Sequence, residues 1–326
     1  MYRIIDEHHT KAEAHFLLYE EAFKNTVVAF LEQVPRDSYA KVFLKEIAAN
    51  KNELIHLLLS GDFGQQKGLI ASIDANLSAW ERKKTGEKKR FIASMKVLFV
   101  DGMYDNDDFF SKNDHVKRVD IEICPYCGRN YVYYAEHPTK TNPHTMVKPD
   151  IDHFLPKNEY PYLAMNYYNL IPSCISCNRV PCKWTNDPIG ATRDKEYLMH
   201  PYEFREGDIS FSYKPTVRLY DKDSIEVRMN CQTSDLDTGY KTWLNLDQFY
   251  VKHNGIVKNM YVRLESLQRS YQRFMGDNFS IPKSFIDHLP EIVFGYKLEP
   301  DKAKEELMYK FKKDIYLQMR KQMYRI

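Results

Sequence analysis

Hydrophobic residues recur every three to four positions along the first third of the chain, which is the period of amphipathic helices. The longest such run covers residues 10–34 and stops at Pro35. Asp37 is a favourable N-cap for the next helix. The pattern predicts further helices over 37–47, 54–59, 71–82 and 88–100. Residues 101–114 are polar and acidic, and we expect a linker there.

From residue 119 to residue 205 the helical period stops, and Cys, Pro, Asn, Tyr and His become frequent. This composition is typical of a small module that is held together by a metal ion. Strand-like alternation and then helices follow, and the pattern predicts strands over 209–213, 217–220 and 225–229 and helices over 240–250, 257–275 and 300–324. We therefore expect an α+β protein with three regions, 1–118, 119–205 and 206–326.

The composition indicates a globular protein but does not identify its function. The chain has 326 residues, of which 43% are hydrophobic and 28% charged, as in ordinary globular proteins. The net charge is only +2, and residues 119–205 hold 9 Lys and Arg against 10 Asp and Glu. Any basic surface must therefore be local. The sequence shows no signal peptide and no membrane-spanning run, so we expect a cytoplasmic protein without a membrane partner.

Two cysteine pairs provide the strongest chemical signal. Cys124-Pro-Tyr-Cys127 is followed by a glycine, and Cys174-Ile-Ser-Cys177 begins 47 residues after Cys127. Four thiolates make a closed tetrahedral site, which is typical of structural Zn²⁺. The alternatives are four free core cysteines or a redox pair, and no βαβ context supports the redox pair. Cys182 and Cys231 are interpreted as ordinary thiols.

Hard oxygen donors and a histidine lie between and beside the cysteine pairs. They form Asp150-Ile-Asp152-His153-Phe-Leu-Pro and Asn169-Leu-Ile-Pro-Ser-Cys174, and Asn178-Arg179 follows the second cysteine pair. In this order and spacing the segment resembles the HNH, or ββα-metal, endonuclease superfamily. The resemblance covers about residues 121–185. It implies that the central region is a zinc-stapled ββα-metal module.

The resemblance also implies a role for each residue. His153 would end a strand and act as general base, Asp152 and Asn178 would hold the catalytic metal, and Asn169 would fix the geometry around His153. The chemistry of these side chains supports the same roles independently of the resemblance. Histidine can accept a proton from water near neutral pH. Carboxylate and amide oxygens suit Mg²⁺ or Mn²⁺, which act as Lewis acids on a phosphate.

One departure from the family concerns the phosphate contact. The family usually has a lysine three residues after the final asparagine, whereas position 181 here is proline. Arg179 and Lys183 are the candidates for this contact. His200, in a His-Pro-Tyr segment, is interpreted as structural. The basic runs 82–90 and 302–325 are interpreted as solvated helix faces rather than as nucleic-acid contacts.

The arrangement looks similar to zinc-stapled HNH effectors of bacterial anti-phage systems, of the Septu and retron-associated type, which pair with an ATPase. The resemblance implies a nuclease for nucleic acid, favouring DNA at low sequence specificity, with a regulatory protein as partner. Two alternatives stay open. One is a zinc-ribbon protein that binds DNA or RNA without cutting, and the other is a scaffold that works only inside a complex.

Overall fold

The computed structural model describes residues 1–49, 52–137, 144–215, 225–275 and 282–324. The chain is α+β and divides into two compact units. The helical unit comprises Ile4–Ile121 and Val132–Glu203, and the C-terminal unit comprises Met1–Arg3, Glu122–Tyr131 and Phe204–Ile326. The division of the chain into regions 1–118, 119–205 and 206–326 stays a prediction. Among the described residues, no helix is long and apolar enough to cross a membrane.

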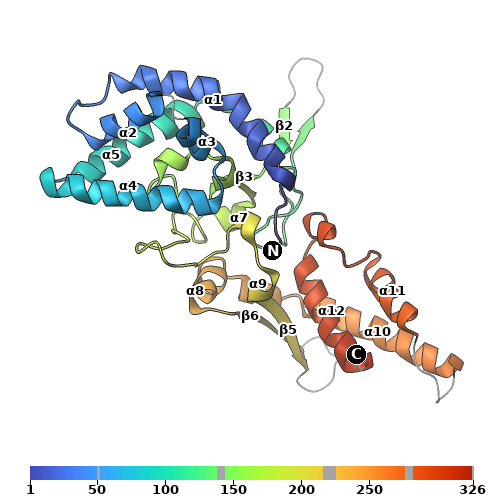
Figure 1. Ribbon diagram of the computed structural model, residues 1–326. Helices are drawn as coiled ribbons and strands as arrows, with labels where there is room; N and C mark the ends of the chain where they lie inside the picture. Colours follow the sequence, from blue (N-terminus) through green and yellow to red (C-terminus); the bar gives the residue numbers. More distant parts are fainter. Residues whose placement is uncertain (50–51, 138–143, 216–224, 276–281, 325–326) are drawn as a thin grey trace. The chain divides into compact units, whose positions relative to one another are not determined.

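The helices expected at the start of the chain are present in the helical unit (Figure 1). They are α1 (Thr10–Leu31), α2 (Tyr39–Ala48), α3 (Asn52–Ser60), α4 (Phe63–Lys83) and α5 (Glu87–Met95). Capping residues determine where these helices begin. The Ser38 side chain, rather than Asp37, caps α2 by accepting a hydrogen bond from Lys41 N. Asp62 and Gln65 form a capping box, which starts α4 well before the expected residue 71.

The linker expected over residues 101–114 is wrong in part. A π-helical segment, η2 (Lys96–Tyr104), continues α5, and α6 (Lys112–Val119) begins after its cap Ser111. The acidic composition of this stretch suggested a linker, but the side chains of Met103, Tyr104 and Phe110 are all buried. Their burial keeps the backbone ordered where the polarity of the sequence suggested a linker.

Three two-stranded antiparallel sheets occur among the described residues. They pair β1 (Ala135–His137) with β2 (His144–Val147), β3 (Asp150–His153) with β4 (Leu170–Ser173), and β5 (Ile209–Pro215) with β6 (Ile225–Cys231). The 3-10 turn η4 (Tyr167–Asn169) leads into β4, and α7 (Ile175–Asn178) follows it. The strands expected at 209–213 and 225–229 are confirmed, while 217–220 lies outside the described residues.

The C-terminal unit packs helices against the β5–β6 hairpin (Figure 1). Its helices are α8 (Ser234–Asp237), α9 (Leu246–Val251), α10 (Asn254–Met275), α11 (Lys283–Phe294) and α12 (Tyr309–Tyr324). Phe311, Ile315 and Met319 are buried on α12, which begins at Tyr309 rather than at the expected residue 300. Along β6 the side chains alternate between buried and exposed, as the strand pattern predicts.

Candidate metal and hydrolytic site

The first cysteine pair lies on a tight turn that depends on glycine. Gly128 N donates to Cys124 O at 2.8 Å, and Cys124 N donates to Asn130 O at 2.8 Å. Gly128 has φ +65°, and a Cβ atom there would lie 2.3 Å from Met1 N. A side chain at this position would therefore collide with backbone in a conformation that already favours glycine.

The second cysteine pair belongs to the start of α7. Cys174 is the N-cap residue of this helix, and Cys177 N donates to Cys174 O at 3.0 Å. Asn178 and Arg179 follow directly, so the position of both residues depends on the same short turn. An interaction that fixes the positions of the two sulfur atoms therefore also fixes the position of Asn178.

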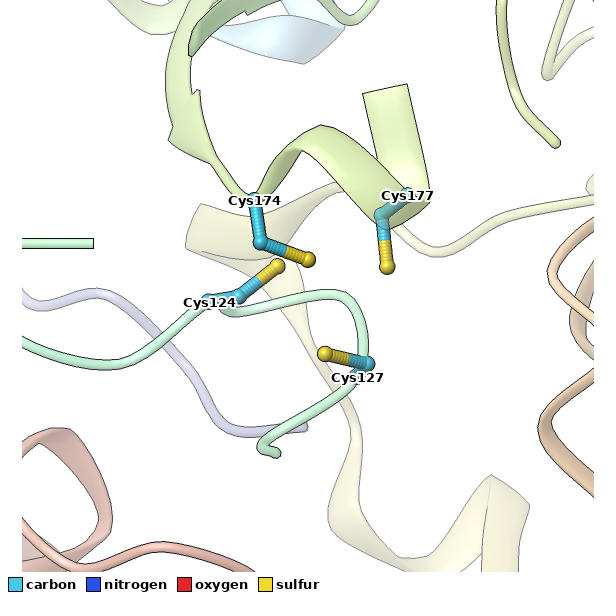
Figure 2. Close-up of side chains that lie close together, drawn as sticks. All are labelled: Cys124, Cys127, Cys174 and Cys177. Atoms are coloured by element: carbon cyan, nitrogen blue, oxygen red, sulfur yellow. The ribbon is translucent and has the colours of Figure 1, made fainter. Parts of the chain in front are cut away.

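The four cysteine side chains point toward one another and form a buried cluster (Figure 2). Their Sγ atoms all lie within 4.8 Å of one another, and none forms a disulfide. A tetrahedral Zn–S₄ site with bonds of about 2.3 Å needs sulfur separations of about 3.8 Å, so a small contraction closes the cluster around an ion. The cluster can therefore hold a metal, and Cys182 and Cys231 lie outside it.

Strand pairing sets the positions of Asp152 and His153. In the β3–β4 pair, Asp152 lies opposite Ile171 and His153 opposite Leu170. His153 is the last residue of β3, as expected. Asp152 and His153 are 3% and 7% exposed, and both line a pocket of about 190 Å³ together with Asn178. The structure thus brings together the base and the two metal ligands that the sequence suggested.

The hydrogen bond of His153 determines which ring nitrogen is basic. Its Nε2 lies 3.1 Å from the carbonyl oxygen of Ala164, which can only accept, so Nε2 carries the proton. Burial, and next the charge of Lys157, hold the pKa of His153 well below its ordinary value. The ring is therefore neutral near pH 7, and Nδ1 has a lone pair for a proton from water.

A tyrosine from the N-terminal helices fixes the other side of the imidazole. The Tyr104 ring meets the His153 ring edge to face, with centroids 4.3 Å apart. Tyr104 and Lys157 line the same pocket as His153. Neither residue was among the candidates that the sequence suggested. Tyr104 lay in the presumed linker, and no local motif distinguishes Lys157 from other lysines.

Asn169 acts on the backbone around His153 rather than on a substrate. Its side chain is fully buried, accepts from Leu155 N at 2.7 Å and donates to the carbonyl oxygens of Leu155 and Leu163. Asn169 O also accepts from Phe154 N at 2.9 Å. These bonds clamp the segment that follows His153, so Asn169 is a positioning residue.

Asp150 organises the residues at the end of α7. The Asn178 amide donates to Asp150 Oδ2 at 3.2 Å, and Arg179 binds both oxygens of that carboxylate through Nε and Nη2. Because Asn178 donates through its nitrogen, its side-chain oxygen is the atom left to bind a cation. Asp150 lies two residues before Asp152 and therefore on the same face of the strand, and its contacts with Asn178 and Arg179 are seen only in the structure.

Lys183 lies in the interior, which removes it from the candidates for phosphate contact. It is 0% exposed, and its Nζ donates to Asp152 Oδ1 and to His153 O, both at 2.9 Å. From that position the ammonium group holds Asp152 and the end of β3. Arg179, by contrast, keeps 59% of its side chain in solvent and remains the candidate for phosphate contact.

This difference gives a matched pair of variants. Lys183→Met is expected to lower the free energy of unfolding by about 3–5 kcal/mol, because it removes the cation that pairs with the buried Asp152 carboxylate. Arg179→Met breaks an exposed pair that solvent and salt screen, and it is expected to change the free energy of unfolding little. Urea unfolding followed by circular dichroism measures both changes. Equal stabilities of the two variants would contradict the buried role of Lys183.

His200 packs in the interior of the helical unit. Its Nε2 lies 3.0 Å from Tyr168 O, and its ring stacks on Phe63 with centroids 4.6 Å apart. Burial lowers its pKa to about 3, so it is neutral in the folded protein. These contacts agree with a structural task.

Comparison with known proteins finds no matching family model, no matching curated protein and no matching solved structure. The likeness to the HNH superfamily therefore rests on the sequence motifs alone.

Proposed function

We propose that this chain is a metal-dependent HNH endonuclease that hydrolyses the phosphodiester bonds of nucleic acid, with DNA as the first substrate to test. The observation that carries the proposal is the meeting of Asp152, His153 and Asn178 at one pocket. The succession of β3, β4 and α7 supports it, because this is the order of elements that the resemblance implies. We further propose that Zn²⁺ occupies the four-cysteine cluster.

The residues suit hydrolysis by an activated water. Mg²⁺ or Mn²⁺, held by the Asp152 carboxylate and the Asn178 amide oxygen, would supply charge screening for the phosphate and the leaving oxygen. His153 Nδ1 accepts the proton of the attacking water, while the bond from Nε2 to Ala164 O keeps the ring oriented. Arg179 is exposed beside this pocket and can contact a phosphate oxygen.

A zinc-ribbon protein that only binds nucleic acid explains the cysteine cluster but leaves the pocket unexplained. Such a protein needs neither a neutral, oriented histidine nor a buried aspartate beside it. A partner-dependent scaffold is the other alternative. A role in anti-phage defence, with an ATPase as regulatory partner, stays a prediction from the motif resemblance.

Incubation of the purified chain with DNA or RNA in Mg²⁺, Mn²⁺ or EDTA separates these functions. The nuclease is expected to shorten nucleic acid in at least one metal and to leave it intact in EDTA. Retarded but uncut nucleic acid under all conditions would favour the binding protein. A chain that cuts only after its partner is added would favour the scaffold.

A further inference from the structure

Trp184 holds a large aromatic side chain in solvent beside the proposed reactive groups. Its exposed fraction is 56%, and it lines the same pocket as Asp152, His153 and Asn178. Trp80 and Trp243 are both less exposed. An indole normally gains stability from burial, so one left open at this place calls for an explanation.

Trp184 has a backbone conformation that is unfavourable for a bulky residue. Its φ is +42°, a left-handed conformation that bulky residues rarely adopt. Trp184 N donates to Asn178 O at 3.1 Å, and the preceding residue is fixed by the buried pair of Lys183 with Asp152. Strain of this kind persists where neighbours enforce it, and it concentrates at functional sites.

Positive charge gathers in the adjoining pocket. This second pocket, of about 310 Å³, shares Trp184, Asn178 and Tyr104 with the first. Its lining holds two acidic and four basic residues, which are Asp105, Asp150, Lys112, Lys148, Lys157 and Arg179. The ion pairs among them are partly exposed and therefore weak, so phosphate oxygens can compete for the cations. The chain as a whole has a net charge of only +2, so the excess of basic residues in this lining is a local feature.

We propose that these two pockets bind single-stranded nucleic acid, with an unpaired base stacked on Trp184 and the neighbouring phosphates on Lys112, Lys157 and Arg179. A base inside a duplex has both faces covered by its neighbours, whereas an unpaired base can stack on an indole. The proposal deepens the proposed function, since it names the substrate class of the same site. Base stacking and phosphate binding can still be measured without any cleavage.

The test uses the full chain with His153→Ala as background, so that Mg²⁺ can be present without the proposed base. A labelled short oligothymidylate and a duplex of equal length are titrated with protein. Adding Trp184→Ala is expected to weaken binding of the single strand by about 5- to 100-fold and to change duplex binding little. Trp184→Phe is expected to keep most of the affinity. Oligothymidylate should quench tryptophan fluorescence in a Trp80→Phe control but not in Trp184→Phe.

The outcomes separate this proposal from the proposed function. Unchanged binding of the single strand by Trp184→Ala would overturn the stacking role and leave a protein partner as the explanation for the exposed indole. An equal loss for strand and duplex would overturn the preference for unpaired bases. If the wild-type chain cuts nothing but binding of the single strand still depends on Trp184, the nuclease proposal fails and the binding site stands.

Discussion

Replacing Cys174 with serine is expected to abolish binding of the proposed zinc ion and to unfold the surroundings of α7. A structural zinc site loses its closed tetrahedron when one of four thiolates is lost, and such sites contribute directly to folding. Because Cys174 occupies the N-cap position of the helix that carries Asn178, the proposed catalytic pocket should lose its shape as well. We expect a loss of about 4 kcal/mol or more in the free energy of unfolding.

Zinc released on denaturation, measured with a colorimetric chelator, and thermal unfolding together check this expectation. Cys231→Ser is the matched control, since Cys231 lies outside the four-cysteine cluster. The control should keep its zinc and unfold close to the wild-type temperature. Full zinc content in Cys174→Ser would contradict the proposed ligand set, as would a wild-type chain purified without any transition metal.

The cysteine cluster could be predicted from the sequence because each of its two Cys-x-x-Cys motifs spans only four residues. Each Cys-x-x-Cys pair fixes two thiolates on one turn, and the structure brings the two pairs within 4.8 Å. The resemblance to the HNH superfamily, which rests on a short motif, placed His153 correctly at the end of a strand. Sequence motifs were thus sufficient for the cysteine cluster and for the end of β3.

The contacts that orient the site could not be predicted in this way, because they join distant parts of the chain. Tyr104 reaches His153 from a segment whose acidic residues concealed its buried side chains. Lys183 seemed a surface phosphate ligand, but the carboxylate of Asp152, 31 residues earlier, draws it into the interior. A lysine's burial depends on a partner that sequence spacing alone does not reveal.

Replacing His153 with alanine is expected to lower the rate of cleavage by about 10²- to 10⁴-fold, the usual contribution of a positioned general base. Zinc content should be unchanged and the chain should still fold, because no cysteine ligand contacts are altered and the Asn169 clamp remains, although the contacts of His153 with Ala164 O and Tyr104 are lost. His56→Ala is the matched control. His56 is a half-exposed histidine of the same unit that pairs with Glu13, away from the pocket. Its variant should cut at the wild-type rate.

Gel analysis of plasmid DNA and circular single-stranded DNA, incubated with wild-type protein or with His153→Ala in Mg²⁺, Mn²⁺ or EDTA, tests the central claim most directly. We predict cutting by the wild type in at least one metal, none in EDTA, and little or none by His153→Ala under any condition. Cutting by His153→Ala at the wild-type rate, or undiminished cutting in EDTA, would contradict the assignment of this pocket as a metal-dependent hydrolytic site.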